Sequence, residues 1–237
     1  DCSELNFLYL RHLFLAAGSG EIVDLLKGGL PDSLDSIYVL LLDRINRSSG
    51  PDFLETCHPI LEILAVTYQS LSTLQISHFS GIDLNQVNTA IQTLQPFLDE
   101  KLVAKEKQYN LYHRSFRDCL ISSKHQEKIW FVESQRAHRC ISNFYLQFAP
   151  SGWNGVDAYG FDFLSDHLQN GGEASQQQLI DIIDKYWRIA KRKYHKTNRA
   201  FLSDLEKAVT CAQHLTFPRA LIETTRLTMM YTLVDNA

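Results

Sequence analysis

Residues 83–121, DLNQVNTAIQTLQPFLDEKLVAKEKQYNLYHRSFRDCLI, hold the pattern that decides the fold. Asp83 is a good N-cap residue for a helix. The apolar residues that follow it share one stripe of that helix, namely Val87, Ile91, Leu94 and Leu98. Pro96 is expected to bend or shorten the helix. LVAKE and QYNLYH then alternate between polar and apolar residues, which predicts the two strands of a hairpin.

The residues before this stretch predict two further helices. Residues 53–68 (FLETCHPILEILAVTY) form an apolar helix that bends or begins at Pro59. Residues 71–81 (LSTLQISHFSG) form a short helix, and Gly81 is suited to end it because glycine adopts the left-handed conformation without steric cost. Three helices followed by a β-hairpin is the order of elements in a winged-helix domain.

Helices are also expected before and after these elements, so the fold class is predicted as mostly α. Upstream, an apolar helix is expected at 4–17, and a second helix is expected from Asp32 or Ser33 to Arg47. Downstream, helical patterns occupy 114–123, 130–149, 157–169, 175–195, 199–213 and 217–234. The sequence therefore predicts a winged helix followed by an α-helical bundle or superhelical domain. The expected domains are 1–30, 31–125 and 126–237.

Composition and charge limit the functions that the chain can have. Its 237 residues carry a formal net charge of −4, which does not favour non-specific binding to nucleic acid or to anionic membranes. No apolar run approaches the roughly 20 residues that a membrane span needs. Five cysteines without a C-x-x-C pair favour a reducing compartment, so a cytoplasmic location is predicted. The chain begins inside an apolar pattern without an initiator methionine, as expected of a fragment of a longer protein.

Motifs for catalysis and for metal binding are missing from the sequence. It contains no G-x-x-x-x-G-K-[ST], no G-x-G-x-x-G, no G-x-S-x-G and no H-E-x-x-H. The residues that could suggest a zinc site are Cys119, His125, His138 and Cys140. Their spacing matches no zinc pattern, so no metal site and no catalytic residue is predicted.

The predicted third helix is not expected to bind DNA. This helix carries no Lys or Arg before Lys101, whereas neutralising phosphates requires several cations. A basic stretch at 188–199 (RIAKRKYHKTNR) could hold an acidic partner or nucleic acid, but a solvated helix end explains it more simply. A winged-helix module that binds nucleic acid or protein remains the alternative function.

Several stretches together resemble NACHT-type STAND NTPases. LNFLYLRHLFLA followed by LPDSLDSIYVLLLDRI is similar to the end of the ATPase module and its connection to a winged helix. YHRSFRDCL is similar to the motif that closes this winged helix. AHRCISNFYL, DAYGFDFLSDHLQNGG and AFLSDLEKAV resemble the helical segment before C-terminal WD40 or TPR repeats. The resemblance spans nearly the whole chain.

The resemblance implies a signalling ATPase that is closed with ADP and open with ATP, and that forms a homo-oligomer when activated in innate immunity or cell death. It implies that His113 donates a hydrogen bond to the β-phosphate of ADP. The alternative is that His113 only caps the following helix. Phe116 and Leu120, four residues apart, are expected to pack that helix onto the domain core.

The expected function is thus that of a regulatory fragment without catalysis. It couples nucleotide state to a sensor through contacts with an ATPase core and a C-terminal repeat domain in the parent protein. The P-loop and the acidic Mg²⁺-binding strand are absent from this sequence, so the fragment itself is expected to hold no cofactor, whereas the parent would use ADP or ATP with Mg²⁺.

Overall fold

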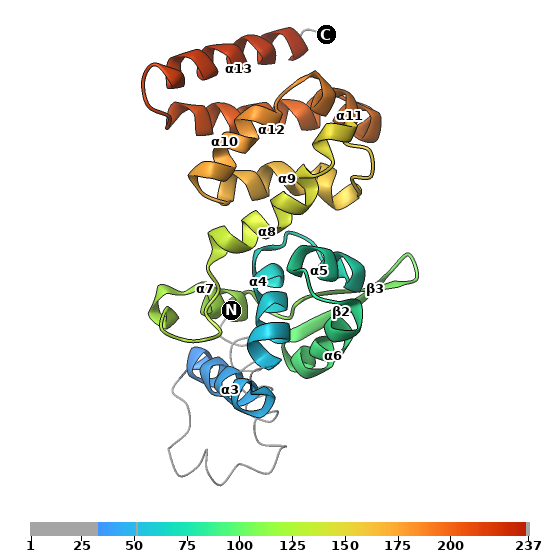
Figure 1. The fold of residues 1–237 in the computed structure, drawn as a ribbon, viewed down its shortest axis with the longest axis vertical. Coiled ribbons are helices and arrows are strands. Elements are labelled where there is room, and N and C mark those ends of the chain that lie inside the picture. Colours follow the sequence, from blue (N-terminus) through green and yellow to red (C-terminus); the bar gives the residue numbers. More distant parts are fainter. Residues whose placement is uncertain (1–32, 51, 236–237) are drawn as a thin grey trace. The chain divides into compact units, whose positions relative to one another are not determined.

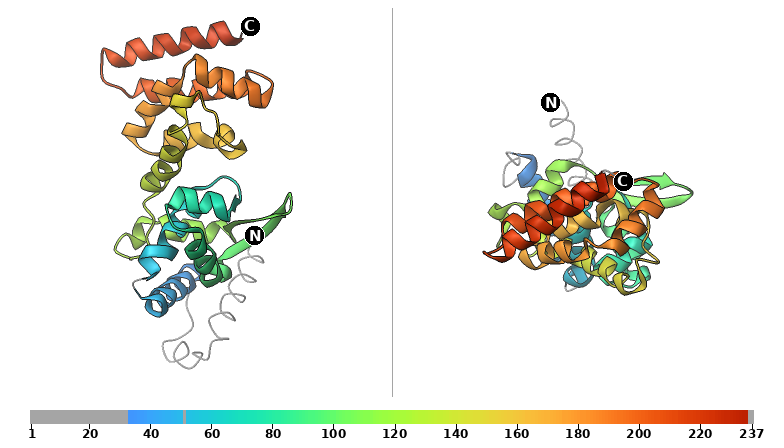
Figure 2. Two further views of the ribbon diagram at one scale, coloured as in Figure 1. Left: turned by 45° about the vertical axis from the view of Figure 1, so that its right-hand side comes forward. Right: turned by 90° about the horizontal axis from the view of Figure 1, so that it is seen from above.

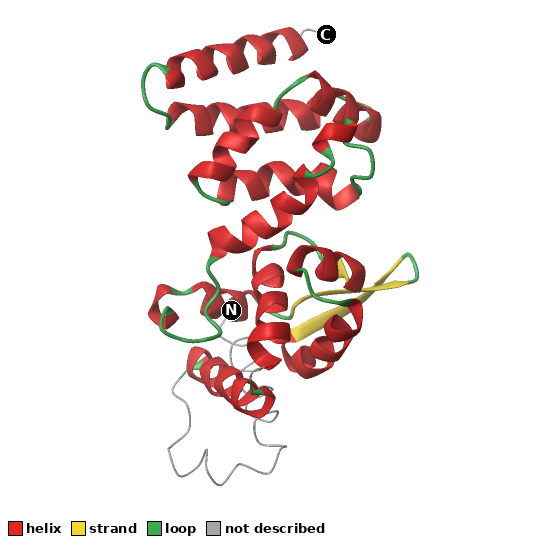
Figure 3. Cartoon of the chain, in the orientation of Figure 1, coloured by secondary structure: helices red, strands yellow, loops and turns green. Residues whose placement is uncertain are grey.

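A computed structural model describes residues 33–50 and 52–235, and these residues are mostly helical (Figures 1 and 3). This confirms the predicted mostly α fold class. The chain divides between Val132 and Glu133 into two compact units. The helix predicted at 4–17 and the expected domain 1–30 lie outside the described residues.

The first unit combines helices with a small antiparallel sheet (Figure 1). Its α-helices are α3 (Leu34–Ser49), α4 (His58–Val66), α5 (Thr73–Ser80), α6 (Leu84–Leu94) and α7 (Arg114–Ile121). Shorter helical turns are η1 (Phe53–Cys57), η2 (Gln95–Phe97) and η3 (Ser123–His125). The strands are β1 (Leu71–Ser72), β2 (Leu98–Val103) and β3 (Glu106–Leu111).

Local capping explains where the helices of the first unit begin and end. Ser72 and Gln75 form a reciprocal capping box at the start of α5, and Gly81 ends this helix in the left-handed conformation with φ of 73°. The Asp83 carboxylate accepts a hydrogen bond from the Asn85 N–H at the start of α6. Pro96 lies in η2, which ends α6. The predictions for Gly81, Asp83 and Pro96 are therefore confirmed, whereas the place of Leu98 on the helix is wrong, because α6 ends at Leu94 and Leu98 begins β2.

The sheet has the strand order β1-β3-β2, and both pairs are antiparallel. Leu98 of β2 pairs with Leu111 of β3, and Val103 pairs with Glu106 across a two-residue turn. The predicted strands placed the turn later, near Lys107, and this was wrong. Ala104 and Lys105 form the turn with φ values of 49° and 72°, which is the two-residue hairpin geometry that follows the twist of the strands.

Aromatic rings fix α7 against the rest of the first unit. The Phe116 ring stacks on Phe97, with ring centroids 4.4 Å apart, and meets the edge of Tyr38 at 5.1 Å. Phe116 and Leu120 are both buried, which confirms that they pack this helix onto the core. Aromatic pairs of this geometry stabilise by about 0.5–1.5 kcal/mol beyond the burial of their area.

The segment 122–132 after α7 is tied to three helices. The Asp43 carboxylate on α3 accepts hydrogen bonds from Trp130 Nε1 and Lys128 Nζ, each at 2.7 Å. His58 Nε2 lies 3.0 Å from the Phe131 carbonyl oxygen. The Val132 N–H donates to the Leu120 carbonyl of α7 at 2.9 Å. These contacts hold the segment against the first unit up to the point where the second unit begins.

The second unit is entirely helical in its described part (Figure 2). Its helices are α8 (Ser134–Leu146), η4 (Ala149–Ser151), α9 (Ala158–Asn170), α10 (Glu173–Ile182), α11 (Lys185–His195), α12 (Arg199–Gln213) and α13 (Arg219–Asp235). The single helix predicted at 175–195 is wrong, because Asp184 interrupts it. The Asp184 carboxylate accepts a hydrogen bond from the Trp187 N–H at 2.8 Å and so begins α11.

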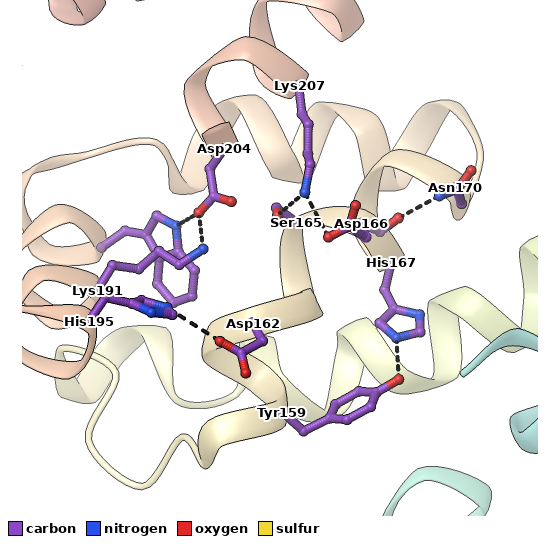
Figure 4. A network of polar contacts seen from close by, with 11 residues as sticks. Tyr159, Asp162, Ser165, Asp166, His167, Asn170, Lys191, His195, Asp204 and Lys207 are labelled. Atoms are coloured by element: carbon purple, nitrogen blue, oxygen red, sulfur yellow. Dashed lines mark hydrogen bonds and ion pairs between the residues drawn. The ribbon is translucent and has the colours of Figure 1, made fainter. Parts of the chain in front are cut away.

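Buried polar groups hold the helices of the second unit together (Figure 4). Asp204 of α12 accepts hydrogen bonds from Lys191 Nζ at 2.7 Å and from Trp187 Nε1 at 2.8 Å. His167 of α9 lies 2.9 Å from the Tyr159 hydroxyl and 2.8 Å from Nδ1 of His138 on α8. Each of these groups has partners, as buried polar atoms require.

A close approach of α8 and α9 occurs at Gly160. A Cβ atom at this position would lie 2.5 Å from Cε1 of Tyr145 on α8. The Tyr145 ring is buried, and its hydroxyl donates to the Asp157 carboxylate at 2.7 Å. Glycine is therefore the residue that fits at this contact.

A search of the described helices for a membrane span gives none, since each is too short or too polar to cross a bilayer. The longest described helix in the second unit, α13, has 17 residues, and Arg226 on it is paired with Glu223. Its buried residues Leu227 and Val234 are seven positions apart, as on the inner face of a helix that packs on a protein core.

Candidate functional site

His113 lies where β3 ends and α7 begins. Its backbone is extended, with φ of −147° and ψ of 148°, and its side chain caps α7. The ring Nδ1 accepts a hydrogen bond from the Ser115 N–H at 3.1 Å and lies 2.8 Å from the Ser115 hydroxyl oxygen. The local role that the sequence left open for His113, capping the following helix, is therefore present in the structure.

The cap determines which ring nitrogen of His113 carries a proton. A backbone N–H can only donate, so Nδ1 must offer its lone pair to Ser115. The proton of the neutral imidazole is then on Nε2, which has no hydrogen bond among the described residues. His113 thus uses one nitrogen for the helix and keeps an N–H donor on the other.

Ser115 links this cap to α3. Its hydroxyl oxygen lies 3.0 Å from the Tyr38 hydroxyl oxygen as well as 2.8 Å from His113 Nδ1. Burial raises the pKa of Tyr38. Tyr38 therefore stays a phenol that can donate to Ser115, while the Ser115 hydroxyl can donate to Nδ1. The ring of His113 is positioned through this chain by a residue 75 positions earlier in the sequence.

The surroundings of His113 are positively charged. An open depression with a volume of about 340 Å³ is lined by His113, by Lys101 of β2, and by Arg114 and Arg117 of α7. No Asp or Glu is among its lining residues. Arg114 has a distant partner outside the depression, since its Nε lies 3.7 Å from Asp118. The depression combines one imidazole donor with three cationic side chains, and a small anion is the ligand that fits them.

Asn110 adds a further polar group to this depression. Its side-chain nitrogen donates to the Leu111 carbonyl at 3.0 Å, while its buried Oδ1 has no hydrogen-bond partner. Buried acceptors without a partner are rare in folded proteins, and they mark positions where a donor from outside the chain can bind. Asn110 therefore adds an acceptor beside the cationic donors.

The residues considered for metal binding separate into two groups. Cys119 and His125 lie together, and Asp35 of α3 joins them. His138 instead contacts His167 in the second unit, and Cys140 lies on the same helix as His138. Asp35 was missed because it lies far from Cys119 in the sequence, and no local spacing connects the two residues.

A second, larger groove lies between α6 and the hairpin. It has a volume of about 710 Å³ and is lined by the amides Asn88, Gln92 and Gln95 and by Tyr109 of β3. The charged side chains at this groove are Glu100 and Lys107, which pair with each other at 2.9 Å. Ile91, Pro96 and Leu98 also line the groove, so its surface is part polar and part apolar and close to neutral in charge, in contrast to the depression at His113.

The basic stretch at 188–199 does not form one continuous surface. Lys191 is buried and paired with Asp204, and His195 Nε2 lies 3.4 Å from the Asp162 carboxylate (Figure 4). Arg192 and Lys193 lie in the last turn of α11, where cations are favoured by the helix dipole. A structural role explains most of this positive charge.

Comparisons of the chain with models of known protein families and with curated proteins give no match. The site is therefore described by its geometry. His113 offers a hydrogen-bond donor, and three cations and a buried acceptor surround it. An anion with several oxygens, such as a phosphate group, is the chemistry that this arrangement suits best.

Proposed function

We propose that the chain is the regulatory fragment of a NACHT-type STAND ATPase, in which residues 31–125 form a winged-helix domain. The fragment has no catalytic activity of its own in this proposal. It couples the nucleotide state of an ATPase core, closed with ADP and open with ATP, to a C-terminal sensor and to oligomerisation. The parent protein would be cytoplasmic and would bind its nucleotide with Mg²⁺.

The order of elements in the first unit supports the winged-helix assignment. The helices α4, α5 and α6 precede a hairpin of β2 and β3, and the short β1 adds the third strand. The described cysteines form no disulfide, which is compatible with a reducing cytoplasm. The all-helical second unit suits a connecting domain that passes movement from one part of a longer protein to another.

The observation that carries the proposal is that the two ring nitrogens of His113 have different roles, Nδ1 as the acceptor of the helix cap and Nε2–H as a donor for a ligand. Nδ1 is held by the helix cap, so the ring orientation is fixed before any ligand binds. Nε2–H is then a preorganised donor for an anion, and Arg117 and Lys101 line the same depression. A contact made to ADP in the closed state alone would favour that state, which is what a nucleotide switch requires.

The experiment must separate the capping role of His113 from the proposed nucleotide contact. Asparagine caps helices well through its Oδ1, but its side chain is shorter than the imidazole and its NH₂ group does not reach the position of Nε2. His113→Asn should therefore keep α7 and lose the Nε2–H donor. In the full-length parent protein loaded with a fluorescent ADP, this variant should release ADP about 10–150-fold faster, because a hydrogen bond to a charged group contributes about 1.5–3 kcal/mol. It should also raise basal oligomerisation, measured by light scattering after size-exclusion chromatography.

Asp118→Asn is the matched control, because Asp118 lies on α7 but outside the depression. It should leave ADP release unchanged. An unchanged ADP off-rate in His113→Asn, with a thermal midpoint equal to that of the native protein, would show that His113 is only a helix cap.

The alternative is a winged-helix module that binds nucleic acid or protein. The described α6 carries no charged residue, which disfavours DNA, whereas the near-neutral groove beside it favours a protein segment. Duplex DNA bound at 50 mM salt with micromolar or tighter affinity, as measured by fluorescence anisotropy, would favour the nucleic-acid version instead.

A further inference from the structure

Three metal-ligating side chains from three different elements meet at the edge of α7. Asp35 comes from the first turn of α3, Cys119 from α7 and His125 from η3. One ligand atom of each lies within 4.8 Å of the ligand atoms of the other two. His125 Nε2 and Asp35 Oδ2 are already 3.1 Å apart. Among the described residues this is the only group of three such side chains.

The distances are close to those of a tetrahedral zinc site. Bonds of about 2.0–2.3 Å from zinc to N, O and S ligands place the ligand atoms about 3.5 Å from one another. Since all the ligand atoms lie within 4.8 Å of one another, the largest separation exceeds this spacing by at most about 1.3 Å. The Asp35 side chain is 49% exposed, so a change of its rotamer can supply this movement without disturbing the core.

We propose that Asp35, Cys119 and His125 bind a Zn²⁺ ion, with water as the fourth ligand. One thiolate, one imidazole and one carboxylate make up a donor set that zinc prefers, whereas magnesium and calcium take oxygen ligands. The thiolate and the carboxylate together balance the charge of the ion. Each ligand forms one bond to zinc, and the proton of the Cys119 thiol leaves to solvent when the Zn–S bond forms. Nε2 of His125, which donates to Asp35 in the metal-free chain, gives up its proton and binds zinc through its lone pair, so the ring then carries its proton on Nδ1.

Cys119 is in its thiol form when no metal is bound. Burial raises the pKa of Cys119, and the charge of the neighbouring Asp35 raises it further. Zinc must therefore displace a proton, so its affinity should increase with pH.

The supporting contacts hold the ligands in place. The Trp130 ring lies against the His125 ring, with centroids 5.1 Å apart, and Trp130 Nε1 donates to Asp43 of α3. The backbone N–H of His125 donates to the Ser122 carbonyl at 2.9 Å and holds the turn that carries the ring. The imidazole is thus fixed against the helix that carries Asp35, as ligands of a metal site are usually fixed by a second layer of contacts.

The test uses the whole chain after treatment with a reductant and a chelator, with Zn²⁺ or Co²⁺ added as the metal alone. One equivalent of Co²⁺ should give the near-ultraviolet absorption of a cobalt–thiolate bond. Zn²⁺ at 100 times its Kd should raise the melting temperature by about 5–10 °C. Asp35→Asn and His125→Gln should each lower the metal affinity at least 10-fold.

Cys119→Ser should remove the cobalt–thiolate absorption, and Cys57→Ser is the matched control because Cys57 is also buried in the first unit. If Cys119→Ser does not fold, the metal affinity of Asp35→Asn still decides the test, because the half-exposed Asp35 side chain can be changed without disturbing the core. Absence of the thiolate absorption in the native chain would overturn the proposal. The same zinc affinity in the native chain and in Asp35→Asn would also overturn it and would identify the metal as an adventitious ion only.

Discussion

Asp204→Asn is expected to destabilise the second unit strongly. Asp204 and Lys191 form a buried ion pair whose side chains are only 2% and 3% exposed. The substitution keeps the size of the side chain and its acceptor for Trp187 Nε1, but it removes the negative charge. The ammonium group of Lys191 is then buried without a counter-charge.

The geometry sets the size of the effect. The Lys191 Nζ to Asp204 Oδ2 distance of 2.7 Å is that of a strong charge-assisted hydrogen bond. Removing one partner of such a buried pair costs about 3–5 kcal/mol, because the remaining charge is left without compensation. A domain is stable by about 5–15 kcal/mol in total, so this loss is large enough to populate the unfolded second unit at room temperature.

The assay is urea unfolding followed by tryptophan fluorescence, since Trp153 and Trp187 belong to the second unit and their rings are in contact at 4.5 Å. Lys191→Met combined with Asp204→Asn removes both charges and should cost less than Asp204→Asn alone. The exposed pair of Arg114 and Asp118 gives the comparison, because Asp118→Asn should change stability by no more than about 0.5 kcal/mol.

Two results would refute this reasoning. One is a cost of less than about 1 kcal/mol for Asp204→Asn, which would mean that water or a change of rotamer compensates the charge of Lys191. The other is a double variant whose cost equals the sum of the two single costs. Additive costs would mean that the two side chains do not interact.

Two further predictions concern the second unit. Burial, and to a lesser extent His138, lowers the pKa of His167 in the folded chain. Below the ordinary histidine pKa of about 6.5, the unfolded chain therefore binds more protons than the folded chain. The free energy of unfolding should be at its full value above that pH and fall by up to about 1.4 kcal/mol per pH unit below it. Urea midpoints measured from pH 7.5 to 5.0 test this, and an equal slope in His167→Gln would contradict it. Gly160→Ala should destabilise by about 1–3 kcal/mol, since its Cβ would overlap the held ring of Tyr145. A thermal midpoint that is unchanged or raised would contradict the close packing of α8 on α9.

The helices could be predicted where local chemistry marks their ends. Asp83 and Gly81 are residues that begin and end helices, and the structure uses them in this way. The break at Asp184 was missed because apolar residues continue at helical spacing on both sides of it. The hairpin turn was misplaced because Ala104 and Lys105 are not typical of positive φ, so tertiary pairing and not local preference sets it.

The candidate site could be predicted only at its centre. His113 was identified from its position between a strand and a helix, and it lies there. The other residues come from distant parts of the sequence. Lys101 of β2 lines the same depression, and Tyr38 of α3 contacts Ser115, which in turn contacts His113. Such contacts depend on how helices and strands pack, and a single sequence carries no local signal for them. The meeting of Asp35 with His125 has the same origin.

The attachment of residues 122–132 has a mechanical consequence. Trp130 and Lys128 are bonded to α3, Phe131 to α4 and Val132 to α7. A force applied to the chain at Glu133 is therefore distributed over α3, α4 and α7, because residues 128–132 are hydrogen-bonded to these helices. Among these links, the Val132–Leu120 hydrogen bond leads to His113 most directly, because Leu120 lies on α7, the helix that His113 caps.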